Sequence, residues 1–187
     1  MKRIMIGYLI IFLGISAAVP VFGSLADRNS ESPVTGLRAG YPSSSSRDTA
    51  VYTDALAAGW TDWSWSTSRD FACTGPVHTG TASISVVHTA AWGGLYLHTD
   101  DHLTGSAYSH LRFWIHGGSA GGHALAVNLY DGGLGGGPAV SVTTVAGTWT
   151  LVEISISDLG NPAAISGIVW QDASGSAQPV YYLDDIE

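Results

Sequence analysis

Alternation of apolar and polar residues is the dominant pattern along this chain. Residues 111–116 (LRFWIH) place Leu111, Phe113 and Ile115 on one side of an extended segment and Arg, Trp and His on the other. The same alternation occurs in three further segments, 82–89, 124–131 and 150–157. Because side chains of a β-strand point alternately to its two faces, this period of two predicts strands with one buried face.

Shorter segments rich in Val, Ile, Thr, Tyr and Trp extend the pattern. They cover residues 50–54, 92–99, 139–144, 166–170 and 180–186. Together the segments predict nine or ten strands, separated by connections rich in Gly, Asp, Ser and Pro. Strands with one apolar and one polar face are typical of antiparallel sheets packed face to face. The predicted fold is all-β, a two-sheet antiparallel β-sandwich of the jelly-roll type.

Two glycine-rich segments, 116–123 (HGGSAGGH) and 131–138 (DGGLGGGP), lie between predicted strands. Neither leads into a helix, and no Lys-Ser or Lys-Thr pair follows either of them. They therefore lack the features of a phosphate-binding loop. We expect both to be hairpin loops that join neighbouring strands.

The N-terminal residues predict export. Lys2 and Arg3 precede an uncharged run over residues 4–23 that ends in small residues, which is the pattern of a secretory signal peptide. The run is close to the ~20 residues that cross a bilayer, so an uncleaved membrane anchor is the alternative. Residues 24–50 are rich in Ser and Pro and read as a linker. One β-sandwich domain is expected at 51–187, in a secreted, extracellular protein.

The charge of the predicted domain limits its partners. The chain has a net charge of -8, and Arg69 and Arg112 are the only Lys or Arg residues after residue 51. Nucleic-acid binding requires several Lys or Arg contacts to phosphates. The composition thus argues against nucleic acid, anionic lipid and polyanionic glycans as partners. It favours a neutral ligand or a cation.

A group of tryptophans suggests where such a ligand would bind. The segment GWTDWSW at 59–65 holds three of the seven tryptophans in the chain. Trp63 and Trp65 are two residues apart, so in a strand they point to the same side. Flat, rigid indoles present apolar area to the C–H faces of sugar rings at low entropic cost. A ligand surface is one interpretation of the pair, and packing in the core is the other. Trp60 is expected in the core or at its rim.

A second set of candidates lies near the ends of predicted strands. Trp170, Gln171 and Asp172 combine an indole with an amide and a carboxylate, which can hydrogen-bond to sugar hydroxyls. Trp92 is followed by two glycines, which would allow a ligand to approach the backbone closely. We include all four residues among the candidate ligand contacts.

The polar sides of two predicted strands, expected to be neighbours, offer an alternative surface. Arg112 and Trp114 share one side of the first strand, and Asn128 and Tyr130 share one side of the second. If the strands are adjacent in a sheet, these four side chains would form a glycan-binding groove. A solvated face without a ligand is the competing interpretation.

Catalytic patterns are weak in this sequence. Glycoside hydrolysis needs two carboxyl groups about 5–10 Å apart across a cleft, and Asp62 and Asp172 are the candidates. No histidine pair has the spacing of a zinc site, no GxSxG motif is present, and Cys73 is the only cysteine. A non-catalytic role is therefore favoured over a hydrolase.

Two strings resemble a known family. PVHTGTASISV at 76–86 and VYYLDDIE at 180–187 are similar to strings in the calcium-containing jelly-roll carbohydrate-binding modules that occur beside secreted glycoside hydrolases. The resemblance extends over essentially all of 51–187. It implies a galactose-binding-like β-sandwich, non-catalytic glycan binding and often a structural calcium ion. The chain departs from that setting because no catalytic domain accompanies the module.

Asp54 and Asp184 are the candidate calcium ligands. The first and last strands of a jelly roll lie side by side, so these carboxylates could approach one another. With backbone carbonyls they would form an oxygen-rich site suited to Ca²⁺, which would tie the two ends of the domain together.

Taken together, the sequence predicts a secreted, non-catalytic module that binds a neutral polysaccharide such as a β-glucan, xylan or mannan through surface tryptophans. Two other interpretations stay open. One is a structural or adhesive extracellular module whose tryptophans are buried at a protein contact. The other is a glycoside hydrolase that uses Asp62 and Asp172.

Overall fold

The computed structural model describes residues 48–132 and 136–187. The predicted signal peptide at 1–23 and all but the end of the predicted linker lie outside the described residues. Within the described part, no helix has the length and apolar character needed to cross a membrane. The elements are β1 (Trp60–Asp62), β2 (Thr67–Cys73), β3 (Ser83–His88), β4 (Gly94–Thr104), the 3-10 turn η1 (Gly105–Ala107), β5 (His110–His116), β6 (Ala124–Tyr130), β7 (Val140–Thr143), β8 (Trp149–Ser155), β9 (Ala164–Asp172) and β10 (Gln178–Asp184).

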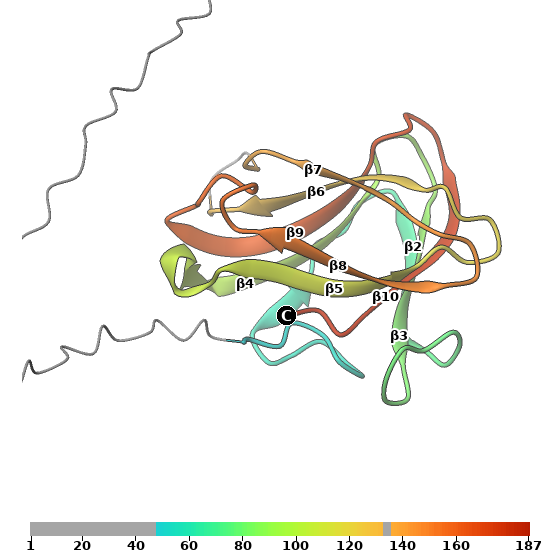
Figure 1. Ribbon diagram of the computed structural model, residues 1–187, viewed down its shortest axis with the longest axis horizontal. Coiled ribbons are helices and arrows are strands. Elements are labelled where there is room, and N and C mark those ends of the chain that lie inside the picture. Colours follow the sequence, from blue (N-terminus) through green and yellow to red (C-terminus); the bar gives the residue numbers. More distant parts are fainter. Residues whose placement is uncertain (1–47, 133–135) are drawn as a thin grey trace, which may run out of the picture. The chain divides into compact units, whose positions relative to one another are not determined.

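The strands form two antiparallel sheets that face each other (Figure 1). The first sheet has the order β1-β4-β9-β6-β7, and the second has the order β2-β3-β10-β5-β8. Most neighbours within a sheet are therefore distant in sequence, as in a jelly roll. The predicted fold class, an all-β two-sheet antiparallel sandwich, is confirmed.

The core lies between the two sheets and is made by the alternating apolar positions. Leu95 and Leu97 of β4 and Ile168 of β9 are buried on the inner side of the first sheet. Phe113 of β5 and Leu183 of β10 are buried on the inner side of the second. Each fully buried side chain of this size contributes about 1.5–3 kcal/mol to folding. Phe113 thus lies on the side where the alternation of residues 111–116 placed it.

The first described residues lie beside the C-terminal end of the chain (Figure 1). The amide of Val51 donates to the carbonyl of Ile186 (2.8 Å), and the amide of Ile186 donates to the carbonyl of Tyr52 (2.9 Å). The expectation that the two ends of the domain run side by side is confirmed. This pairing brings Asp54 and Asp184 to the same end of the molecule.

One expected neighbour relation is wrong. β5 and β6 belong to different sheets, so the glycine-rich connection between them crosses the sandwich and is not a hairpin. Gly118, Gly121 and Gly122 have φ between 58° and 70°, a backbone conformation that glycine adopts without steric cost. The second glycine-rich segment does join the adjacent strands β6 and β7, as expected.

Candidate functional site

The outer side of the first sheet carries a group of aromatic rings, which we call the aromatic face. Its members are Trp63, Trp65, Tyr96, His98 and Tyr130. The two indoles follow β1 and continue its pairing with β4, because the amide of Trp63 donates to Tyr96 O (2.9 Å) and that of Trp65 donates to Gly94 O (3.0 Å). This extended backbone points both indoles to the same side, as their spacing predicted.

Tyr96 lies at the centre of the aromatic face. Its ring contacts Trp63 edge-on at 6.0 Å between centroids and Trp65 edge-on at 6.4 Å. On its other side it lies 5.1 Å from the ring of Tyr130. Trp63 also stacks on His98, with 3.6 Å between ring centroids and 20° between planes. Trp63 is 56% exposed and Trp65 is 36% exposed, so packed rings fix two indoles that still face solvent.

Two glycines on neighbouring strands make room for these rings. A Cβ atom at Gly94 would lie 2.6 Å from Cη2 of Trp65, so the indole lies directly over the backbone of β4. A Cβ atom at Gly167 of β9 would overlap the ring of Tyr96. The absence of side chains at these positions lets the rings lie against the sheet.

Trp92 adjoins one end of the aromatic face and is the most exposed of these tryptophans, at 59%. Its carbonyl accepts hydrogen bonds from Nε1 of Trp65 (2.8 Å) and Nε2 of Gln171 (3.1 Å). Its φ of 63° costs a non-glycine residue about 1–3 kcal/mol. The surrounding hydrogen bonds hold this strained backbone and keep the indole at the surface.

Asp172 supplies the main support for Trp92. Its Oδ2 accepts the amides of Trp92 (2.9 Å) and Gly175 (3.0 Å), and its Oδ1 accepts from Ser174 Oγ and Gln178 Nε2, both at 2.6 Å. Burial alone would raise the pKa of Asp172, but the hydrogen bonds from Ser174, Trp92 and Gly175 lower it to about 2. Asp172 is 1% exposed, so it is a fixed internal anion. The prediction that Asp172 contacts the ligand is wrong.

Trp170 is also inside the molecule. Its side chain is fully buried and packs edge-on against Phe113, with 5.3 Å between ring centroids. Ile168, Trp170 and Asp172 share one side of β9 and point inward, which leaves Gln171 on the outer side. The prediction of Trp170 as a ligand contact is therefore wrong, while Gln171 does lie on the face of Trp65 and Trp92.

Asp62, the other carboxylate considered for hydrolysis, is paired as well. Its Oδ2 accepts from Nε of Arg69 (2.5 Å), and its Oδ1 accepts the amide (3.0 Å) and hydroxyl (2.5 Å) of Ser64. Burial acts to raise the pKa of Asp62, but these hydrogen bonds outweigh it and lower the pKa. The carboxylate thus shapes the turn between Trp63 and β2.

The strand register separates Asp62 from Asp172. Asp62 pairs with Leu97, and Leu97 pairs with Ile168, which precedes Asp172 by four residues. At ~3.3 Å per residue and ~4.8 Å per strand, the two carboxylates are about 13 Å apart along the strands and two strands apart across them. That exceeds the spacing of a glycoside hydrolase pair. The hypothesis that they form a catalytic pair is wrong.

The four residues of the predicted groove are divided between two faces. Tyr130 belongs to the aromatic face, and Asn128 shares its side of β6. A Cβ atom at Gly136 would overlap the amide of Asn128, so the backbone of Gly136 lies against that side chain. Arg112 and Trp114 lie on the outer side of the second sheet, because β5 and β6 are in different sheets. A single groove made by all four residues is therefore wrong.

The candidate calcium ligands hold the connection between β2 and β3 from two sides. Asp54 Oδ1 accepts the amides of Thr81 (2.5 Å) and Ala82 (2.9 Å), and Asp184 Oδ2 accepts those of His78 (2.8 Å) and Thr79 (3.4 Å). Burial raises the pKa of Asp184, and the neighbouring charge of Asp185 acts in the same direction.

Two carboxylates together with backbone carbonyls would be a donor set that suits Ca²⁺. Within residues 48–132 and 136–187, no group of three or more His, Cys, Asp or Glu side chains is placed to hold a metal ion. A calcium ion here would therefore depend on Asp54, Asp184 and backbone carbonyl or water oxygens. Calcium binding stays a prediction.

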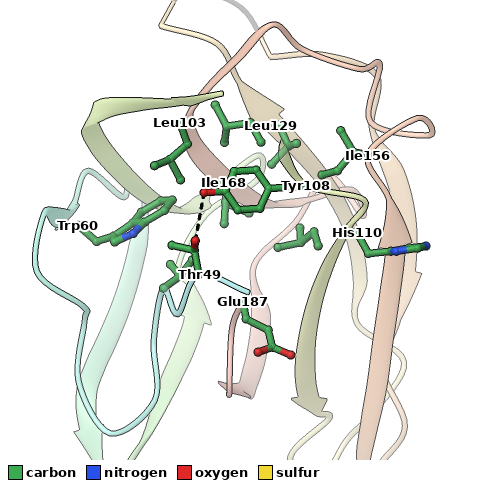
Figure 2. A pocket seen from close by; sticks show the side chains of 12 residues that line it. Thr49, Trp60, Leu103, Tyr108, His110, Leu129, Ile156, Ile168 and Glu187 are labelled. Carbon is green, nitrogen blue, oxygen red and sulfur yellow. Dashed lines mark hydrogen bonds between the residues drawn. The ribbon is translucent and has the colours of Figure 1, made fainter. Parts of the chain in front are cut away.

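A small apolar pocket opens at one end of the sandwich (Figure 2). Leu103, Leu129 and Ile168 line it, as do Thr49 and Tyr108, whose hydroxyls are 3.1 Å apart. Its volume is about 40 Å³, which is space for about one water molecule. The pocket is a packing defect of the core and is too small for a sugar ring.

Tyr96 and His98 were not predicted as site residues. They lie in a segment, LYLH, that alternates like the other strands. Their outward parity could be read from the sequence, but their contact with Trp63 depends on the pairing of β1 with β4. The signal that would have identified Tyr96 and His98 is their position on the outer side of β4, next to the strand that leads into the exposed tryptophans.

Comparison with known proteins supports this architecture. No protein-family model matches the chain. A curated endoglucanase from Dictyostelium discoideum is 25% identical over 150 residues, which cover 76% of this chain and 21% of the endoglucanase. The chain therefore matches about a fifth of the length of that relative.

Among solved structures, the family 29 carbohydrate-binding module CBM29_1 from Piromyces equi has a TM-score of 0.50 at 14% identity, covering 74% of this chain and 86% of that one. The family 11 module of a cellulosomal cellulase from Clostridium thermocellum has a TM-score of 0.52 at 17% identity, covering 74% and 91%. The fold of this chain is that of carbohydrate-binding modules. The expected resemblance is confirmed at the level of the fold.

The family 11 module from Clostridium thermocellum has also been solved with a β-1,3-1,4-mixed-linked tetrasaccharide. That structure has a TM-score of 0.51 at 16% identity and covers 70% of this chain and 88% of its own. The structural neighbours named here are thus carbohydrate-binding modules, and they share the fold of this chain.

Proposed function

We propose that this chain is a secreted, non-catalytic carbohydrate-binding module that holds a neutral polysaccharide on its aromatic face. The observation that carries the proposal is the exposure of three indoles, those of Trp63 and Trp65 on the aromatic face and that of Trp92 in the loop beside it. Indoles held by packing and hydrogen bonds lose little entropy on binding, which favours affinity for the apolar faces of sugar rings.

The charges around the site support a neutral ligand. Arg69 is paired with Asp62, and Arg112 is paired with Glu187 and Asp48. Neither guanidinium is therefore available as an unpaired charge for a uronate or sulfate group. Gln171, on the outer side of β9, can instead exchange hydrogen bonds with sugar hydroxyls. The mixed-linked tetrasaccharide bound by the family 11 neighbour makes a mixed-linkage β-glucan the first ligand to test.

Replacing both Trp63 and Trp65 by alanine tests the proposal. We expect about a tenfold loss of affinity for each indole, because each forms exposed apolar contact area fixed by its neighbours. The measurement is retardation in affinity gels that contain mixed-linkage β-glucan, xylan or mannan. Val145→Ala, which removes an equally exposed apolar side chain from a loop after β7, is the matched control and should migrate like the unmodified protein.

The same experiment distinguishes glycan binding from the structural or adhesive interpretation. Unchanged retardation of the Trp63→Ala, Trp65→Ala double variant on every glycan that retards the parent protein would show that the aromatic face is not the site. If the parent protein binds none of the glycans and instead forms oligomers that grow with concentration, the structural or adhesive interpretation is supported.

Calcium binding at Asp54 and Asp184 is a separate part of the proposal. The ion would neutralise the buried Asp184 and hold the loop between β2 and β3 against both ends of the domain. We expect a chelator to lower the melting temperature and added Ca²⁺ to restore it. Asp54→Asn should remove this response. A melting curve unchanged by chelator in the parent protein would contradict the calcium site.

A further inference from the structure

The second sheet carries its own group of half-buried rings on its outer side, facing away from the aromatic face. Trp114 of β5 lies beside Leu151 of β8 in the strand register, and Leu151 is 48% exposed. The ring of His78 stacks on Trp114, with 3.8 Å between centroids and 18° between planes. Trp149 adds a T-shaped contact to His78 at 5.7 Å.

A cavity of about 350 Å³ opens beside these rings. We call it the Trp114 cavity, after the ring at its side, and its lining includes His78, Thr79, Arg112, Trp114, Leu151 and Asp185. This volume is at the lower end of the range of small-molecule sites, and it is nearly nine times that of the apolar pocket between the sheets. The lining combines apolar surface with several polar groups.

The polar groups of the Trp114 cavity are already ordered by hydrogen bonds. Asp185 accepts from Thr79 Oγ1 and lies against Nδ1 of His78, both at 2.7 Å. The amide of His78 donates to Asp184 Oδ2 (2.8 Å), which fixes the loop that holds the stacked ring. A site whose side chains are ordered before binding avoids the entropic cost of ordering them.

Arg112, which shares the outer side of β5 with Trp114, supplies hydrogen-bond donors to the cavity. Its Nη2 lies 2.6 Å from Glu187 Oε1 and 3.4 Å from Asp48 Oδ1. These contacts involve one terminal nitrogen of a guanidinium that has five N–H donors in a planar fork. Because Asp48, Asp185 and Glu187 outnumber Arg112, an anionic ligand is disfavoured. The chemistry suits hydroxyl groups, which both accept from the guanidinium and donate to the carboxylates.

We propose that the Trp114 cavity is a second saccharide-binding site, which takes one or two rings of a neutral glycan against Trp114 and Leu151. The assignment of a glycan as its ligand rests on the proposed function, but the site shares no residue with the aromatic face. The two sites lie on the outer sides of opposite sheets, so one molecule would hold two glycan segments at once. Two linked sites raise the avidity for a polymer without any new contact.

Stoichiometry of binding distinguishes the two sites. In isothermal titration of the full chain with tetrasaccharides of mixed-linkage β-glucan, xylan or mannan, we expect two ligands per protein. Trp114→Ala and the Trp63→Ala, Trp65→Ala double variant should each bind one, and the triple variant should bind none. Leu151→Asp, at an exposed position on an edge strand, should also reduce the ratio to one without unfolding the domain. Val145→Ala should keep it at two.

Each result decides between the proposals. The parent protein could bind one tetrasaccharide per molecule, and only the Trp63→Ala, Trp65→Ala variant could abolish this binding. That result would overturn the second site and leave the aromatic face as the binding surface. A ratio of one that only Trp114→Ala or Leu151→Asp abolishes would overturn the aromatic face and support the Trp114 cavity. Absence of binding to all three tetrasaccharides would overturn both assignments.

Discussion

Replacing Asp172 by alanine should lower the free energy of unfolding by about 3 kcal/mol. The buried carboxylate accepts the amides of Trp92, Ser174 and Gly175 and the side-chain amide of Gln178. Its removal takes the acceptor from these four donors; the hydrogen bond to Gln178 is buried and the other three are partly buried, and an unpaired buried donor costs about 1–3 kcal/mol before local relaxation. Loss of a buried hydrogen-bond network is one of the few mechanisms that give single-residue effects of this size.

Urea unfolding at pH 7, followed by tryptophan fluorescence, measures this effect. Asp158→Ala is the matched control, because Asp158 is exposed and its removal should change stability by no more than about 0.5 kcal/mol. A similarly small change for Asp172→Ala would show that Asp172 does not support the loops around Trp92.

The same residue predicts a specific acid response. The pKa of Asp172 is about 2 in the folded protein, and that of an unfolded aspartate is about 3.9. The stability that this shift contributes is fully present above pH 4 and is lost as the pH falls towards 2, and it amounts to about 2 kcal/mol. The parent protein should therefore lose more stability between pH 4 and pH 2 than Asp172→Ala does.

This result would also bear on ligand binding. Asp172 holds the amide of Trp92, whose backbone has a φ of 63°. Without that hydrogen bond the strained loop can relax, and the indole must be ordered again when a glycan binds. If the aromatic face binds a glycan as proposed, Asp172 would contribute by positioning Trp92, whereas the sequence suggested direct contact with the ligand.

Much of the fold could be predicted because side-chain alternation is local information. A strand such as 111–116 shows its buried side through Leu111, Phe113 and Ile115 alone, whatever its neighbours are. The two-residue spacing of Trp63 and Trp65 is also local information, and it placed both indoles on one side correctly.

The sheet to which a strand belongs is not local information. The glycines between β5 and β6 are compatible with a hairpin and with a crossing between sheets, and the structure shows the crossing. That one difference places Arg112 and Trp114 on the opposite side of the molecule from Tyr130. Short-range turn chemistry could not decide it, because glycine tolerates both paths.

The error at the end of β9 has a different cause. Residues 166–170 form a continuous small or apolar run, which lacks the alternation that marks an inner and an outer side. A shift of one residue exchanges all side chains between the two faces. In the structure, Trp170 and Asp172 point into the protein and Gln171 points out. This orientation depends on the pairing of β9 with β4 and β6, which the sequence of the segment does not show.

Replacing Gly167 by alanine should remove most of the glycan affinity of the aromatic face, because it displaces the Tyr96 ring that supports both indoles. The new Cβ atom would overlap the ring of Tyr96 and lie 3.0 Å from the carbonyl oxygen of Leu97. The ring must therefore lift off the sheet, and it then loses its edge contacts with Trp63 and Trp65. We expect about a tenfold loss of affinity for mixed-linkage β-glucan, with a loss of stability of about 1–2 kcal/mol from the added methyl group.

Two variants show whether the effect passes through Tyr96. Gly75→Ala makes the same change where no atom lies within 4 Å of the new Cβ, and it should bind like the parent protein. Tyr96→Ala removes the ring that Gly167→Ala displaces, so the two substitutions together should weaken binding little more than Tyr96→Ala alone. Affinity gels measure binding, and urea unfolding confirms that each variant is folded. If the losses of binding free energy in the double variant are fully additive, the two substitutions do not act through the same ring. The indoles would then be supported by His98 and Gly94, which contact Trp63 and Trp65 directly.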